Sequence, residues 1–86
     1  MRKYLVKILT NTQEQDASTI TAYVPEEGES TRDFDERVKV AYHNILSAYH
    51  NADDVLYAVV QIVNEYGNVE IMEIVNHIPE PEPVEV

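Results

Sequence analysis

The chain has 86 residues, with 6 Lys and Arg against 16 Asp and Glu, a formal net charge of −10 and no cysteine. This length suits one domain, and the lack of cysteine excludes disulfides and thiolate zinc ligands. Phosphate groups are bound by Lys and Arg, so the charge argues against direct nucleic-acid binding and against anionic membrane surfaces. Residues 40–86 hold eight acidic residues and neither Lys nor Arg. A basic protein is therefore the charged partner that the composition allows.

Hydropathy along the chain predicts a cytoplasmic protein. The apolar stretch Tyr4 to Leu9 is interrupted by Lys7 and is too short for the apolar part of a signal peptide. No stretch approaches the roughly 18 apolar residues that a membrane helix needs. We therefore expect neither a signal segment nor a membrane span.

Two alternating segments open the chain. Residues 2–10 place Tyr4, Val6 and Ile8 on one side and Leu5, Lys7 and Leu9 on the other, which is typical of a strand. Residues 17–24 alternate in the same way, and Pro25 ends the segment because it lacks the N–H that a sheet ladder requires. Joined by a short polar loop, the two strands are predicted to form an antiparallel hairpin.

A helix of about five turns follows. Ser30 or Thr31 can cap its first turn, with Asp33 in the position of a capping box. Apolar residues then recur every three or four positions and predict one buried helical face. That predicted face consists of Phe34, Val38, Ala41, Ile45, Ala48 and Ala52.

The second half of the chain predicts another hairpin. Residues 55–63 are a nearly continuous apolar run of strand length, and residues 69–78 return as a fourth strand. Between them, residues 64–68 form a turn in which Gly67 can adopt a positive φ. Residues 79–86 alternate proline and glutamate and are expected to be an extended or disordered tail.

The predicted fold class is therefore α+β, with the order ββαββ. Layer packing favours a four-stranded, mostly antiparallel sheet with one helix packed on one face. Residues 1–78 form the single domain, and the order of the strands within the sheet stays open.

The strands carry more apolar side chains than one helix can cover. In residues 55–63, Leu56, Ala58, Val60 and Ile62 alternate with Val55, Tyr57, Val59 and Val63. Contiguous exposed apolar patches commonly mark interfaces. The sequence thus predicts an interface of Tyr57, Val59, Val63, Val69 and Ile71. The simplest occupant is a second copy of the chain in a homodimer or small homo-oligomer. The alternative is that the end of the helix, the loops and the tail cover this side within one chain.

Residues with catalytic or metal-binding chemistry form no pattern. His43 and His50 are seven positions apart on the helix, whereas metal-binding pairs on helices favour three or four, and His77 ends a strand. The paired carboxylates lie in loops and at the helix start, and no motif for a nucleophile or a phosphate loop is present. We therefore predict no enzyme, no catalytic residue, no metal site and no cofactor.

The residues Tyr42-His43, Val55 to Val63 and Asn64 to Asn68 carry a resemblance. The hairpin, helix and hairpin layout resembles a class of small uncharacterised proteins from phages and prophages of gut-type bacteria, over most of residues 2–78. This resemblance implies a viral or mobile-element origin and no known activity.

Three functional hypotheses follow, of which the third, a small enzyme or metal protein that uses His43, His50 and His77, is the least supported by the residues. The first is a non-enzymatic, acidic interaction module that self-associates or binds a protein partner through an exposed sheet face. The second is an acidic mimic of nucleic acid that inhibits a DNA- or RNA-binding protein, because the acids after Ala41 are not balanced by bases. Such a mimic needs its carboxylates in rows on one surface.

Overall fold

The computed structural model describes residues 2–12 and 14–78, and these residues form one sheet and one helix. The strands are β1 (Tyr4–Thr12), β2 (Asp16–Tyr23), β3 (Val55–Asn64) and β4 (Val69–Asn76), and the helix α1 spans Thr31–His50 between β2 and β3. The predicted α+β class and the order ββαββ are thereby confirmed. The predicted tail, residues 79–86, lies outside the described residues.

The strands lie in the order β2-β1-β3-β4, and every neighbouring pair is antiparallel. Because β2 and β3 both pair with β1, they run in the same direction on either side of it. Connecting two such strands requires a crossover of a dozen residues or more. The 20-residue helix α1 provides it, with a length of about 30 Å, which matches the length of the strands.

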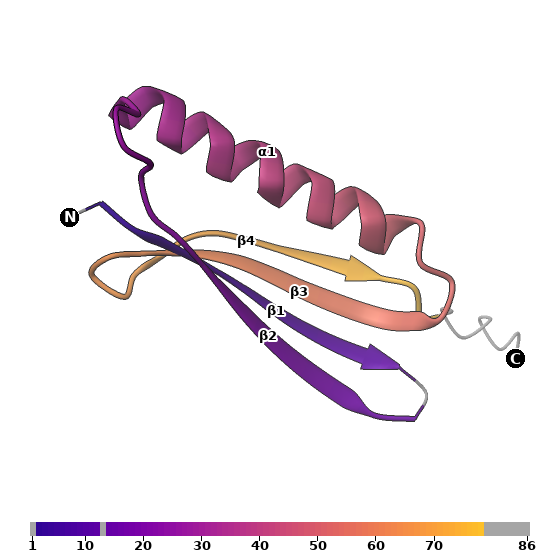
Figure 1. The fold of residues 1–86 in the computed structure, drawn as a ribbon. Coiled ribbons are helices and arrows are strands. Elements are labelled where there is room, and N and C mark those ends of the chain that lie inside the picture. The colour runs from indigo at the N-terminus through magenta and orange to yellow at the C-terminus, as the bar shows by residue number, and fades with distance from the viewer. Residues whose placement is uncertain (1, 13, 79–86) are drawn as a thin grey trace, which may run out of the picture.

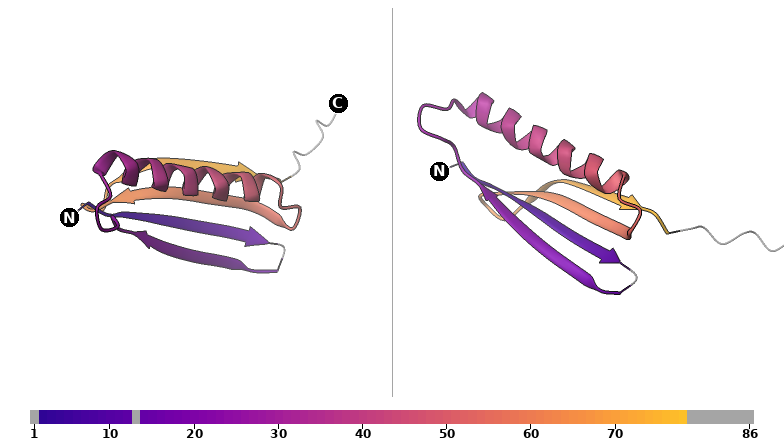
Figure 2. Two further views of the ribbon diagram at one scale, coloured as in Figure 1. Left: turned by 45° about the horizontal axis from the view of Figure 1, so that its top comes forward. Right: turned by 45° about the vertical axis from the view of Figure 1, so that its right-hand side comes forward.

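The helix covers one face of the sheet, and it does so unevenly. It packs on β3 and β4, while the β1–β2 hairpin diverges from it, so that β2 lies farthest from the helix (Figures 1 and 2). The core lies between the two layers and is built from Tyr4, Val6, Phe34, Val38, Tyr42, Leu46, Val55, Ala58, Val60, Ile62 and Val75.

The helix begins as predicted, at an N-cap. The Ser30 hydroxyl accepts a hydrogen bond from the Asp33 backbone N–H at 3.1 Å. Its buried face differs from the predicted one, because Tyr42 and Leu46 enter the core while Ala48 is exposed. The core residues of α1 recur every four positions, whereas the predicted residues recur at mixed spacings of three and four. Two such rows move gradually apart around a helix. The placement of α1 over β3 and β4 selects the first row.

The turn between β3 and β4 is also as predicted. Gly67 has a φ of 83°, in the left-handed region where a side chain is disfavoured. The Asn64 side-chain oxygen accepts hydrogen bonds from the N–H groups of Tyr66 and Asn68 at 2.9 and 3.0 Å. These local bonds specify a tight turn without help from the rest of the fold.

The side-chain alternation of β3 is confirmed in its centre, where Ala58, Val60 and Ile62 face the helix and are buried. Val55 was expected on the opposite side but belongs to the core, since the β1–β3 register shifts at that end of the pairing. On β4, the residue paired with Ile62 is Ile71. Residues paired across a sheet point to the same face, so Ile71 lies on the helix side.

Candidate interaction surface

The sheet face that points away from α1, called the open face below, is organised in cross-strand rows. The registers of the three strand pairs align one residue from each strand, in the order β2, β1, β3, β4. The first row is Ala22, Leu5, Val63 and Val69; the second is Ile20, Lys7, Gln61 and Met72; and the third is Ser18, Leu9, Val59 and Ile74. A fourth, more polar row closes the face with Asp16, Asn11, Tyr57 and Asn76.

Large apolar side chains on this face are exposed to solvent. The exposed fractions are 61% for Ile74, 59% for Ile20, 53% for Met72, 52% for Val69 and 43% for Leu9. They come from β1, β2 and β4. The open-face residues of β3 are half-buried or buried between their neighbours. Apolar side chains therefore span the sheet in the first row and run from β1 to β4 in the third, while Lys7 and Gln61 occupy the centre of the second. Exposed apolar side chains gathered on one face often mark interaction sites.

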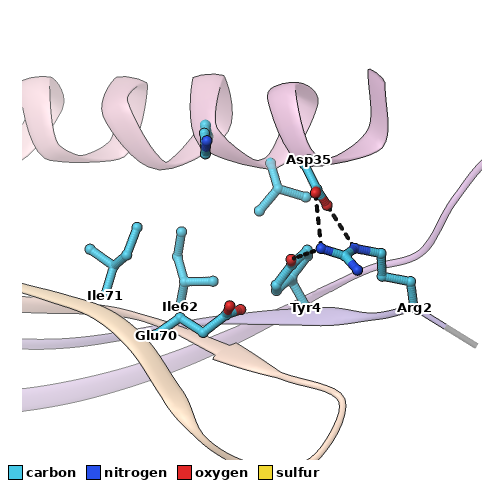
Figure 3. A pocket seen from close by; sticks show the side chains of 8 residues that line it. Arg2, Tyr4, Asp35, Ile62, Glu70 and Ile71 are labelled. Carbon is cyan, nitrogen blue, oxygen red and sulfur yellow. Dashed lines mark hydrogen bonds and ion pairs between the residues drawn. The ribbon is translucent and has the colours of Figure 1, made fainter. Parts of the chain in front are cut away.

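Four of the five residues predicted for the interface lie on this face. Tyr57 and Val59 are half-buried there, and Val69 is exposed. Val63 is already buried within one chain, with 4% of its surface exposed. The fifth, Ile71, lies on the helix side, where its side chain points towards α1 (Figure 3). Besides Val69, β4 contributes Met72 and Ile74 to the open face, and neither was predicted. The alternation of side chains along β4 shows which residues share a face. It does not show which of the two faces the helix covers.

Sequence reasoning also missed the contribution of the first hairpin. Leu9 and Ile20 are exposed on the open face and stand in neighbouring rows. The alternation of both strands was visible, with Leu5 and Leu9 on one side of the first and Ile20 and Ala22 on one side of the second. That these sets share the open face follows from the register Lys7 to Ile20, which a single strand does not reveal.

The charge on the open face contrasts with the charge of the chain. Its first three rows contain no acidic residue, although the chain has 16 acids. Their single charge is Lys7, which is half-buried and makes no ion pair with any of the described residues. Lys7 and Leu9, with Ser18, Ile20, Val59 and Gln61, line a shallow hollow of about 300 Å³. Among the described residues, the one acid on the open face is therefore Asp16, in its polar fourth row.

A second hollow of about 300 Å³ lies between the start of α1 and the sheet (Figure 3). Arg2 donates one hydrogen bond to each carboxylate oxygen of Asp35, both at 2.9 Å, and a third to the Tyr4 hydroxyl at 3.0 Å. Burial raises the pKa of Tyr4, and the carboxylates of Asp35 and Glu70 add to the effect. The Arg2 guanidinium therefore links the start of β1 to α1, which is a structural role.

The remaining polar groups of the described residues include histidines and carboxylates. The described residues contain no group of three His, Cys, Asp or Glu side chains that could hold a metal ion. His77 bonds through Nε2 to the Tyr49 carbonyl at 2.8 Å, and His43 packs edge-on against Tyr42. Glu14, Asp53 and Asp54 line an open hollow of about 470 Å³ at the far end of the sheet, where no basic side chain accompanies them.

The described part of the chain has no helix that is both long and apolar enough to cross a lipid bilayer. Comparisons of the chain with family models, with curated proteins and with solved structures give no significant match in any of the three.

Proposed function

We propose that this chain is a non-enzymatic interaction module that self-associates, with its open face packed against the open face of a second copy. The observation that carries the proposal is the set of five large apolar side chains that remain 43–61% exposed on one face of the sheet. Full burial of such a side chain contributes about 1.5–3 kcal/mol. The half of each that is still exposed therefore represents roughly 1 kcal/mol, or on the order of 10 kcal/mol for the two faces of a symmetric dimer.

This gain is comparable with the roughly 4–15 kcal/mol that association costs in lost motion and ordering. The complex is therefore of moderate strength, and a single unfavourable substitution is enough to dissociate it. Two sheets packed face to face keep their strands within about 30° of one another and interdigitate their side chains. The hollow beside Lys7 provides room for a side chain of the facing copy.

The charge distribution favours a second copy over a basic protein. A basic partner would be attracted to carboxylates, and the three apolar rows contain none. A second copy has a net charge of −10 of its own, and it can approach the first three rows of this face without placing acid against acid. A viral or mobile-element origin fits a small self-associating module and adds nothing to the choice of partner.

Matched substitutions test this proposal. Ile74→Lys places a charge in the open face, and Val40→Lys places the same charge on α1, where Val40 is 56% exposed. Sedimentation velocity should show the wild-type chain and Val40→Lys as assemblies at micromolar concentration. Ile74→Lys should weaken association by at least about tenfold, which corresponds to 1.4 kcal/mol. A wild-type chain that sediments as a single copy, or an Ile74→Lys variant that associates as the wild type does, would overturn the proposal.

Ionic strength separates the two kinds of partner. Copies with a charge of −10 repel one another, and salt screens this repulsion, so self-association should strengthen between low and physiological salt. Binding of a basic protein to the acids, as the nucleic-acid mimic requires, should weaken over the same range.

A further inference from the structure

The edge of the sheet at β2 is a second unpaired surface, distinct from the open face. Seven of its eight residues are exposed and Tyr23 is half-buried. The strand diverges from α1, so neither the helix nor a described loop covers its outer edge (Figure 2). An edge strand presents a row of unpaired N–H and C=O groups, which is a template for pairing with another strand.

This edge lacks the devices that usually prevent such pairing. Charged side chains, prolines and bulges blunt natural edges. Residues 17–23 contain no charged residue and no proline. The β1–β2 register runs over eight pairs without a shift, whereas the other two pairings are both irregular. The opposite edge, β4, carries Glu70 and Glu73. Over residues 17–23, β2 is thus a regular, uncharged edge of an acidic chain.

The hairpin geometry identifies the free main-chain groups. The Thr12 N–H donates to the Gln15 carbonyl at 2.9 Å, and bonded and non-bonded pairs alternate along an antiparallel ladder. On β2, Ala17, Thr19 and Thr21 therefore bond to β1. The N–H and C=O groups of Ser18, Ile20 and Ala22 point outward, away from β1.

We propose that β2 pairs with β2 of a second copy, antiparallel and about a two-fold axis at Ile20. This register brings Ile20 opposite Ile20 of the second copy and Ser18 opposite Ala22, so that all outward groups of residues 18–22 are satisfied by about six hydrogen bonds. It also places Thr19 directly opposite Thr21 of the second copy, a cross-strand pair that favours association. The two sheets become one sheet of eight strands.

The pairing concerns a different surface from the proposed function and does not depend on it. A two-fold axis perpendicular to the sheet keeps both open faces on the same side and makes them continuous. Two of these eight-stranded sheets can then stack through their open faces, which gives a closed assembly of four copies. Edge pairing alone, or face packing alone, gives two copies.

Like charges introduced at the paired threonines test the edge pairing. The side chains of Thr19 and Thr21 are exposed and lie on the opposite side of the sheet from the open face. In a Thr19→Lys/Thr21→Lys variant, lysine faces lysine across the axis, and like charges directly opposite destabilise strand pairing. Sedimentation should show that this variant has half the mass of the wild-type assembly. A Thr19→Glu/Thr21→Glu variant should behave in the same way, and an equimolar mixture of the two should recover the wild-type mass.

The control places the same two charges elsewhere. Asn44→Lys/Ser47→Lys changes two exposed positions on α1 and should leave the mass unchanged. Ile74→Lys should halve the mass through the open face, and its combination with Thr19→Lys/Thr21→Lys should give single copies. If Ile74→Lys alone has no effect, the proposed function fails and the edge pairing stands. If the Thr19→Lys/Thr21→Lys variant keeps the wild-type mass, or the mixture of opposite charges does not recover it, the edge pairing is overturned.

Hydrogen exchange on the unmodified chain gives a test that needs no variant. In the assembly, the outward amides of Ser18, Ile20 and Ala22 should exchange as slowly as those of Thr19 and Thr21, which bond to β1. Exchange of the outward amides at the rate of free peptide, at a concentration where the chain is assembled, would overturn the edge pairing.

Discussion

Arg37 on α1 donates one hydrogen bond to each carboxylate oxygen of Glu29, at 2.9 and 3.0 Å. The same guanidinium donates to the Val24 carbonyl at 2.8 Å and lies 5.4 Å from the centre of the Phe34 ring. One side chain thus joins the end of β2, the loop before the helix and the core. The direction in which the chain leaves β2 is held by these contacts, which matters because β2 is otherwise weakly covered.

The Arg37–Glu29 pair predicts a stability that depends on pH. The hydrogen bonds from Arg37, with one from the Glu26 N–H, hold the pKa of Glu29 below its ordinary value of 4.5. A depressed folded-state pKa stabilises the fold above the ordinary value, and this contribution is lost as the pH falls through the folded-state pKa. In urea titrations, the difference in unfolding free energy between the wild-type chain and Glu29→Gln should be constant near neutrality and shrink in acid. A difference that does not change in acid would contradict this account.

Tyr42 predicts a substitution that does not destabilise the fold. Its side chain is 1% exposed, and its hydroxyl has no hydrogen-bond partner among the described residues. A buried polar group without a partner is unfavourable by about 1–3 kcal/mol. Tyr42→Phe should therefore raise the free energy of unfolding by about 1 kcal/mol, measured by urea titration. Tyr66→Phe, at a position 80% exposed, should leave it unchanged. A loss of stability in Tyr42→Phe would show that the hydroxyl is bonded in solution.

The same tyrosine also predicts behaviour at high pH. Burial raises the pKa of Tyr42 above its ordinary value of 10.0, and the carboxylate of Glu73 adds to the shift. The unfolded chain ionises at the ordinary value while the folded chain stays neutral, so stability falls as the pH rises above 10.0. The Tyr42→Phe variant should lose less stability than the wild-type chain over this range. Equal losses would mean that Tyr42 ionises freely in the folded chain.

The helix cap predicts a local loss of stability. Replacing a serine N-cap with alanine typically costs about 1 kcal/mol, because the first-turn N–H loses its acceptor. Ser30→Ala should show this loss in thermal or urea unfolding, and Ser30→Asp should retain the stability. Ser47→Ala, on the exposed side of α1, serves as the matched control and should be nearly neutral. A Ser30→Ala variant as stable as the control would contradict the assigned cap.

The secondary structure could be predicted from the sequence because its signals are local. Strand alternation, the serine cap and the turn at Gly67 each depend on a few neighbouring residues, and the predicted limits of the strands agree with the structure to within two residues. The signals that set the limits of the helix are equally local. The identity of its buried face does not follow from local signals. Both Ala41 and Tyr42 fit an apolar row of helical spacing, and only the packing of α1 on β3 and β4 places Tyr42 in the core.

The surplus of apolar side chains was likewise visible in composition and alternation, whereas its location was not. Strand order and register depend on contacts between residues far apart in the chain. The pairing of Ile62 with Ile71 puts Ile71 beneath the helix, and the pairing of Lys7 with Ile20 brings Ile20 onto the open face. A sequence by itself therefore determined the elements and the excess of apolar surface. Tertiary structure alone decided which side chains share a face, because a shift of one residue in register turns every side chain of a strand to the other side.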